Sequence, residues 1–128
     1  MCRLGICSLA AAFFAACAPD LEALTTAPPG ATAELDASDE EIRLTRGAAL
    51  GVACTDGANL CDNMVVRVDD PEIADARVAF RDVLELDWDS GASAATSFII
   101  FGKLAGKTRV TVDSSEGSVG YDVVVLDP

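Results

Sequence analysis

The sequence predicts an all-β protein, a small β-sandwich of about seven short strands over residues 42–128. From Ile42 onward, apolar and polar residues alternate with the period of two that is typical of half-buried strands. Two other stretches are continuously apolar, as expected for central strands. Turn-forming residues separate these stretches, at 69–71, 90–91, 102, 105–106 and 114–117.

Residues 1–16, which precede this domain, have the composition of a signal peptide. One positive charge, Arg3, is followed by an apolar, alanine-rich run from Leu4 to Ala16. This run is shorter than the roughly 20 residues that a membrane-spanning helix needs. We therefore expect the leader to be removed on export.

The leader ends in Phe14-Ala15-Ala16-Cys17, which resembles the lipobox of bacterial lipoproteins, although phenylalanine stands where that motif usually has leucine. The resemblance implies that Cys17 is lipidated and becomes the new N-terminus. More than one acyl chain gives a lasting membrane anchor. Ala18 follows the cysteine, which resembles the pattern of lipoproteins sent to the outer membrane. The sequence does not indicate whether the protein would lie on the periplasmic or the surface face of that membrane.

Two alternatives for this segment stay open. Cleavage after Ala18 fits the small-x-small rule for ordinary secretion, but it would leave Pro19 first after the cut. A retained core helix would need a polar face at helical spacing, which the segment lacks.

Residues 17–41 are predicted to be the lipidated cysteine and a disordered tether. Three prolines, the absence of aromatic residues and the acidic run 39–41 support this interpretation. A flexible coil of this length would have an r.m.s. reach on the order of 25 to 30 Å. The tether would hold the domain clear of a membrane.

The first strands of the domain surround a pair of cysteines. Ile42 and Leu44 alternate with polar neighbours, and Cys54 and Cys61 flank a short turn-rich segment. In an oxidising compartment this pair is expected to form a disulfide that staples a hairpin, worth roughly 2 to 3 kcal/mol. Zinc and redox roles are disfavoured, because the chain has no histidine and the spacing is not that of an active dithiol.

Four aspartates near glycines are weak candidates for calcium binding: Asp56 and Asp62 at the cysteine turn, and Asp87 and Asp89 after the alternating stretch 83–88. Neither group follows the spacing of a known calcium loop. Asp is also common at turns because its side chain bonds the local backbone. We therefore predict no metal and no other cofactor.

The last strands are predicted over 97–101, 109–113 and 123–126. Pro71 is expected after a strand end, and Gly106 is expected to supply a positive φ in the turn before Thr108. Lys103, Lys107 and Arg109 form a basic cluster around this turn. The cluster is either a solvated, charge-protected edge or a docking patch for a partner.

The net charge limits the classes of partner. The chain has 9 basic and 21 acidic residues, a net charge of −12, so nucleic acid is excluded as a partner. Without histidine or a free thiol in the mature chain, the usual general base and thiol nucleophile are absent. We predict that the protein is not an enzyme and has no small-molecule substrate.

Two stretches of the domain resemble known families. "VRVDDPEIADARV" and "IIFGKLAGKTRVTVDSSEGSVGYDVVVLDP" resemble the second half of bacterial immunoglobulin-like group 2 domains. The turn Gly102-Lys103 and Gly106-Lys107-Thr108 is also similar to the N-terminal domain of pilus-assembly secretins. Both resemblances imply a secreted immunoglobulin-like domain that binds or positions other macromolecules, with no catalytic residues.

Two functions follow as hypotheses. The first is an envelope lipoprotein that presents its domain for structural or adhesive contacts with proteins or glycans. The second is an accessory subunit of a pilus or secretion machine, docking through an edge strand or the basic turn.

Overall fold

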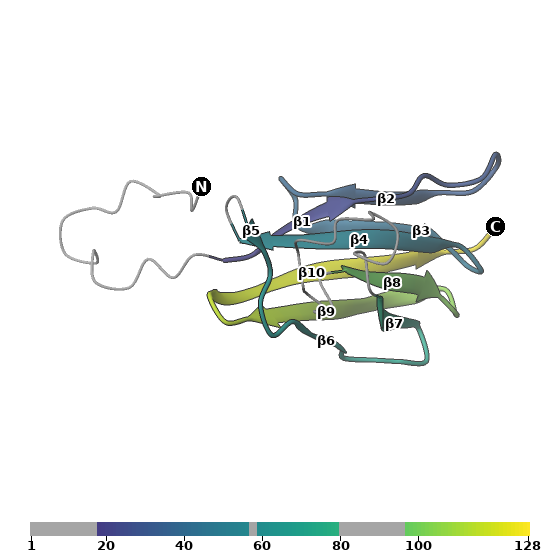
Figure 1. Cartoon of the computed structure of the whole chain (residues 1–128). Coiled ribbons are helices and arrows are strands. Elements are labelled where there is room, and N and C mark those ends of the chain that lie inside the picture. Colours follow the sequence, from purple (N-terminus) through teal and green to yellow (C-terminus); the bar gives the residue numbers. More distant parts are fainter. Residues whose placement is uncertain (1–17, 57–58, 80–96) are drawn as a thin grey trace.

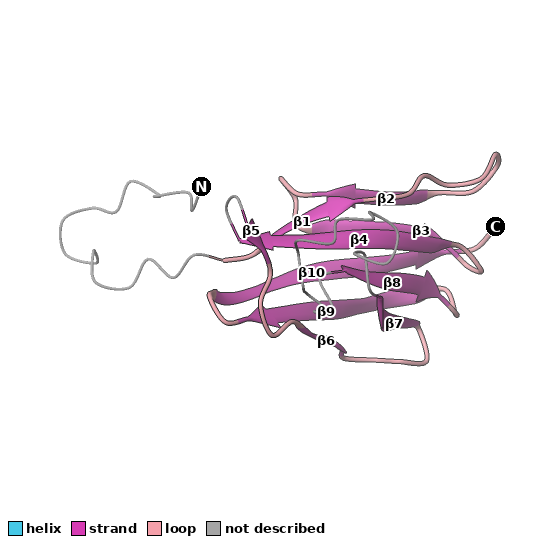
Figure 2. Ribbon diagram, in the orientation of Figure 1, coloured by secondary structure: helices cyan, strands magenta, loops and turns pink. Residues whose placement is uncertain are grey.

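The computed structural model describes residues 18–56, 59–79 and 97–128 and shows an all-β sandwich, as predicted (Figures 1 and 2). One sheet has the strand order β1-β4-β8-β7, with β5 also paired to β4. The other has the order β2-β3-β10-β9-β6. In the first sheet the strands are β1 (Asp20–Ala23), β4 (Ala49–Asp56), β5 (Asn59–Leu60), β7 (Ala74–Ala79) and β8 (Ser97–Gly102). In the second they are β2 (Ala33–Asp36), β3 (Glu41–Thr45), β6 (Val65–Val68), β9 (Gly106–Ser114) and β10 (Gly117–Leu126).

The described residues thus form nine strands and the two-residue β5, where the sequence predicted about seven. Two of the extra strands, β1 and β2, lie within residues 18–41, so the prediction that this segment is a disordered tether is wrong. Leu21 and Ala33 are buried in the common core, which fixes both strands to the domain. Pro28 and Pro29 lie in the connection between the strands, where a missing N–H interrupts no ladder.

The N-terminal strands add one edge to each sheet. β1 pairs antiparallel with β4, with Leu21 opposite Cys54. β2 pairs antiparallel with β3, and β3 pairs in parallel with β10, with Ile42 opposite Val123. Because β1 and β2 pair with strands of the two sheets, the domain begins well before residue 42.

The core lies between the sheets and is filled by alternating inward side chains. Its largest fully buried members are Phe98, Ile100, Leu50 and Val52 from one sheet and Ile42, Leu44, Val110, Val112 and Val123 from the other. The predicted alternations at 42–45 and 109–113 therefore place the right residues inside.

The predicted central strands are central, but they are not buried on both faces. β8 lies between β4 and β7, and β10 lies between β3 and β9. Ile99 of β8 is 44% exposed, because it points away from the partner sheet while its neighbours Phe98 and Ile100 point inward. A continuous apolar run therefore indicates a central strand in the sheet, but it does not indicate that both faces of that strand are buried.

The turn features predicted at Pro71 and Gly106 are present. β6 ends at Val68 and β7 begins at Ala74, so Pro71 lies between strands. Gly106 has a φ of 154°, as predicted, and a Cβ there would lie 3.0 Å from Cδ1 of Ile73. The alternating stretch predicted at 83–88 and the turn predicted at 90–91 lie outside the described residues.

Candidate functional site

The predicted disulfide joins Cys54 and Cys61, with a Cα–Cα distance of 5.4 Å. It closes the β4–β5 hairpin, in which Thr55 pairs with Leu60, and the N–H of Cys61 donates to the carbonyl of Cys54 at 3.2 Å. Both cysteines are buried, at 0% and 1% exposure, and belong to the core cluster. The bridge is therefore a core element as well as a hairpin staple.

The predicted basic cluster is divided by the structure. Lys107 and Arg109 project from the same side of β9 and share one carboxylate, that of Asp122 on β10, at 3.7 and 3.0 Å. Lys103 donates instead to the carbonyl oxygen of Pro71 at 2.9 Å. All three cations are exposed, and Asp122 offsets part of the charge of Lys107 and Arg109.

The calcium candidates that the structure describes, Asp56 and Asp62, both lie beside the end of β9. Asp56 accepts a hydrogen bond from the hydroxyl of Ser114 at 3.1 Å, and the backbone carbonyl of Asp62 accepts from the N–H of Ser115 at 2.9 Å. Within residues 18–56, 59–79 and 97–128, no three His, Cys, Asp or Glu side chains are placed to hold a metal ion. Asp87, Asp89 and the predicted lipidation site Cys17 lie outside the described residues.

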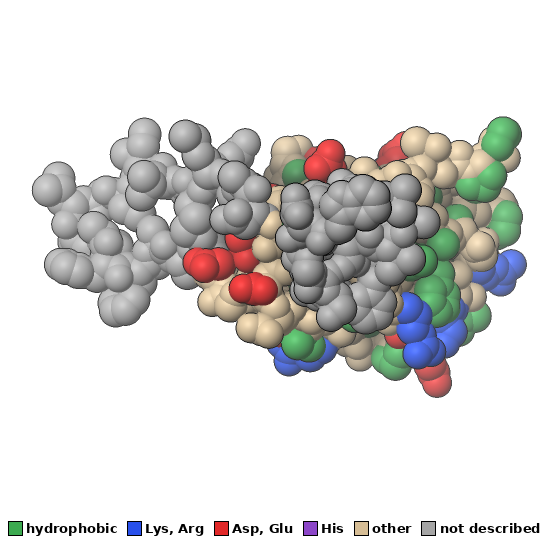
Figure 3. Space-filling model, in the orientation of Figure 1, with side chains coloured by type: hydrophobic (Ala, Val, Ile, Leu, Met, Phe, Trp, Pro, Cys, Tyr) green, Lys and Arg blue, Asp and Glu red, His purple; other side chains and the backbone are tan. Residues whose placement is uncertain are grey.

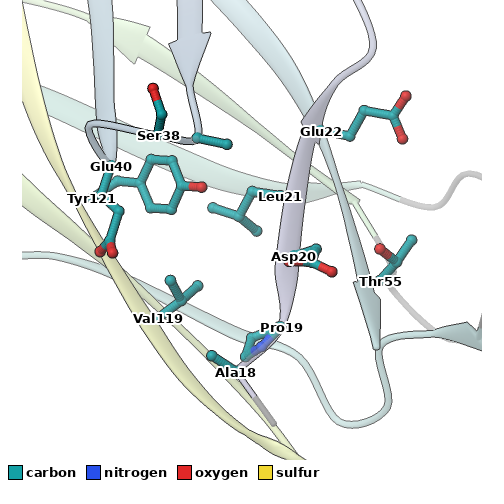
Figure 4. Close-up of a pocket in the computed structure, with 11 residues that line it drawn as sticks. Ala18, Pro19, Asp20, Leu21, Glu22, Ser38, Glu40, Thr55, Val119 and Tyr121 are labelled. Carbon is teal, nitrogen blue, oxygen red and sulfur yellow. The ribbon is translucent and has the colours of Figure 1, made fainter. Parts of the chain in front are cut away.

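A hollow that the sequence did not predict lies at one end of the sandwich, with a volume of about 700 Å³ (Figure 4). The start of β1 forms one wall, and β10 with the β2–β3 turn forms the other. Its lining is apolar at Leu21 and Val119 and acidic at Asp20, Glu22 and Glu40. Among the described residues of the lining, none is basic. The hollow is thus an acidic opening between the two sheets.

Tyr121, the single tyrosine of the chain, projects from β10 into this hollow. Figure 4 shows its ring reaching toward β1, with the hydroxyl close to Leu21. The side chain is only 4% exposed, and its hydroxyl makes no hydrogen bond within the described part of the chain. Burial raises the pKa of the Tyr121 hydroxyl, and the carboxylates of Glu40, Asp20 and Asp36 raise it further.

The β2–β3 turn is held in place by Asp36. One oxygen of its carboxylate accepts hydrogen bonds from the hydroxyl of Ser38 at 2.6 Å, the N–H of Ser38 at 2.9 Å and the N–H of Asp39 at 3.1 Å. The hydrogen bond from the Ser38 hydroxyl, together with those from the backbone, lowers the pKa of Asp36. This turn carries Glu40, a non-glycine residue with a positive φ of 49°, to the wall of the hollow.

One signal for the hollow is visible in the sequence. A single tyrosine stands in an alternating strand otherwise rich in valine, and the acids of 36–41 come from another part of the chain. Their proximity depends on the parallel pairing of β3 with β10, which local patterns do not specify. Because residues 18–41 were predicted to be a disordered tether, β1 was not expected to form a wall of a site.

Charge is unevenly distributed over the face drawn in Figure 3. Carboxylate side chains gather at the left of the described surface, and most lysine and arginine side chains lie toward the right and lower edges. The described part of the chain contains no helix long and apolar enough to cross a membrane.

Comparison with protein-family models and with curated proteins gives no match. The resemblances to immunoglobulin-like group 2 domains and to secretins are therefore not confirmed. Solved structures of the surface-layer protein SbsC are similar to this chain. Domains 4–9 of that protein give a TM-score of 0.50 at 18% identity, over 85% of this chain and 14% of that one.

Shorter pieces of the same protein are also similar. Domains 4 and 5 give a TM-score of 0.47 at 21% identity, over 84% of this chain and 53% of that one. Domains 5–6 give 0.48 at 22% identity, over 84% and 45%. The chain thus spans about half the length of the shorter structures or less, and the likeness to domains 4–9 supports the β-sandwich fold.

Proposed function

We propose that this protein is an exported, non-catalytic structural module of the bacterial cell envelope, anchored to the outer membrane by lipid on Cys17. The observation that carries the proposal is the buried disulfide between Cys54 and Cys61. Disulfides persist in oxidising compartments outside the cytoplasm, and a small domain gains most from such a bridge. The signal-peptide pattern of residues 1–16 supports export independently.

The structural role is supported by the fold. The similar solved structures are domains of a surface-layer protein, and this chain is a sandwich of the same kind. The sequence contains no histidine, and both cysteines of the described core are bonded to each other. A histidine general base is therefore absent, and neither of these two cysteines can act as a thiol nucleophile.

The position of β1 changes how such an anchor would hold the domain. Asp20, the first residue of β1, is only three residues after Cys17. Three extended residues span at most about 10 Å. A lipid on Cys17 would therefore hold the sandwich against the membrane surface, with the β1 end nearest to it.

Lipidation is tested by intact mass and by detergent partition of the exported protein. We expect the wild type to carry the mass of the acyl groups and to enter the detergent phase, and Cys17→Ser to do neither. Cys7→Ser, in the predicted leader, is the matched control and should leave the lipid in place. An unmodified wild-type mass beginning at Pro19 would instead establish plain secretion.

The structural role is tested by mild cross-linking in native envelopes, capture of the protein and mass spectrometry of its partners. Abundant envelope proteins or glycans are the expected partners. Reproducible recovery of pilus or secretion subunits would favour the second candidate, an accessory subunit of such a machine.

The observation behind the second candidate is that Lys103, Lys107 and Arg109 are all exposed around one turn. The double variant Lys103→Glu/Lys107→Glu should abolish docking if this turn is the interface. Arg67→Glu, an exposed cation on β6, is the matched control. Unchanged partner recovery in a folded double variant would remove the turn as a docking site.

A further inference from the structure

We propose that the hollow between β1 and β10 binds an alkylammonium group on an aliphatic stem, the chemistry of a lysine side chain on a partner protein. The inference goes beyond the structural role, because it assigns a ligand class to a site that this role does not use. It is argued from the described residues at the β1 end of the sandwich, which is also the end that a lipid on Cys17 would hold nearest to the membrane.

Tyr121 is the first observation behind this inference. A buried hydroxyl without a protein partner costs free energy, so a native structure that keeps one usually supplies a partner from outside. The hydroxyl of Tyr121 is buried, lies in the hollow and makes no hydrogen bond within the described residues. Its oxygen can accept a hydrogen bond from an N–H donor.

The charge of the walls determines the sign of the ligand. Asp20 lies on the β1 side and Glu40 on the β2–β3 turn, and both side chains are exposed at the rim (Figure 4). Both carboxylates act on Tyr121, since both raise the pKa of its hydroxyl. With three acids and no base among the described lining residues, the hollow attracts cations and repels anions.

The shape of the lining favours an organic cation over a metal ion. The acids are spread around the opening, and no three of them are placed to hold a metal within the described chain. Leu21 and Val119 provide an apolar surface against which methylene groups can pack. The ring of Tyr121 can also attract an ammonium group through its face.

The same charges favour a lysine side chain over the headgroup of an aminophospholipid. In such a headgroup the ammonium lies close to a phosphate, which Asp20, Glu22 and Glu40 would repel. A lysine side chain carries no neighbouring anion. Charge complementarity therefore selects a protein partner for this acidic opening.

The test is an NMR titration of the exported protein as cells produce it, with the ring resonances of Tyr121 as reporter. Because Tyr121 is the only tyrosine, its ring signals are unambiguous. The probe is Nα-acetyl-lysine N-methylamide, and the matched control probe is the norleucine analogue, which keeps the stem and lacks the ammonium. We expect saturable shifts with the lysine probe only, with a Kd on the order of 1 mM for one partly exposed side chain.

Variants locate the binding. Glu40→Gln and Asp20→Asn should each weaken binding about 3- to 10-fold by removing one charge. Glu72→Gln is the control, since this exposed acid lies in the β6–β7 connection beside Lys103, at the far end of the sandwich. Tyr121→Phe should fold and bind more weakly, with the methyl resonances of Leu21 as its reporter.

Several outcomes would overturn the proposal. Equal shifts with both probes would show that only the apolar stem is bound. Shifts with neither probe would show that the hollow does not bind this class of ligand. Shifts caused by calcium chloride or by aminophospholipid vesicles, without any from the lysine probe, would assign the site to a metal ion or to a membrane. None of these results bears on lipidation of Cys17, so the two proposals fail separately.

Discussion

The two ends of the sandwich are built differently. At the closed end, where the β8–β9 turn meets the β3–β4 turn, backbone groups bond each other directly. The N–H of Gly47 donates to the carbonyl of Gly102 at 2.9 Å, and the N–H of Gly102 donates to that of Ala48 at 3.0 Å. A Cβ on Gly102 would lie 3.0 Å from Cγ1 of Val125, so a side chain there would require Val125 to shift.

At the open end, where β1 faces β10, the sheets leave a hollow of about 700 Å³. There the chain is held by the buried disulfide, by Leu21 and by the turn that Asp36 organises. In this sandwich, close backbone packing stabilises one end and a buried cross-link stabilises the other. The opening between the sheets lies at the cross-linked end.

The largest effect should come from removing the disulfide. Cys54→Ala/Cys61→Ala loses the loop constraint and two buried sulfurs, so the free energy of unfolding should fall by about 3 to 5 kcal/mol. Urea unfolding followed by circular dichroism measures the change. A double variant as stable as the wild type would show that the open end is held by packing alone.

The next effect tests whether β1 belongs to the domain. Leu21 is 6% exposed and packs in the core, so Leu21→Ala should cost about 2 to 4 kcal/mol. Leu24→Ala, just beyond the strand at 43% exposure, is the matched control and should change stability by less than about 1 kcal/mol. Equal and small losses of stability in the two variants would instead support the prediction that residues 18–41 form a tether.

The closed end is tested by Gly106→Val. The positive φ and the contact with Ile73 should together cost about 2 to 3 kcal/mol. Gly30→Val is the control for backbone strain, because Gly30 also has a positive φ, of 83°, but has nothing within 4 Å of a Cβ. Urea midpoints that shift equally in the two variants would mean that crowding against Ile73 contributes nothing.

The decrease in stability at low pH should depend on the β2–β3 turn at the open end. Because folding lowers the pKa of Asp36, its contribution is present above the usual aspartate range near pH 4 and is lost as pH falls below it. Asp36→Asn should therefore be less stable near neutral pH and lose less stability on acidification. Parallel profiles of urea midpoint against pH for wild type and variant would contradict this assignment.

The smallest effect is expected at the shared ion pair between the ends. Asp122→Asn removes the carboxylate that contacts Arg109 and Lys107, whose side chains are half exposed or more, so stability should change by less than about 1 kcal/mol. The variant also exposes the full charge of the basic turn. If that turn docks to an acidic partner, cross-linking yield should rise; a fall in yield would count against docking there.

Much of the fold was predictable because the relevant signals are local. The alternation at Ile42 and Leu44, the strand end before Pro71 and the positive φ of Gly106 each reflect the conformation of a few neighbouring residues. The pairing of Cys54 with Cys61 was predictable for the same reason, because the two residues are separated by only seven positions. The extra strands were missed because β1 and β2 are short, and their stability comes from partners far along the chain.

Periodicity, backbone preference and short-range chain closure specify the all-β class, the turn features at Pro71 and Gly106, and the disulfide. Long-range packing places β1 and β2 in the sheets, brings Asp122 beside Lys107 and Arg109, and sets Tyr121 in the same hollow as Asp20 and Glu40. The physical reason is common to all three. Each depends on which strands lie side by side, and that arrangement is selected by burial of the whole core rather than by any single segment.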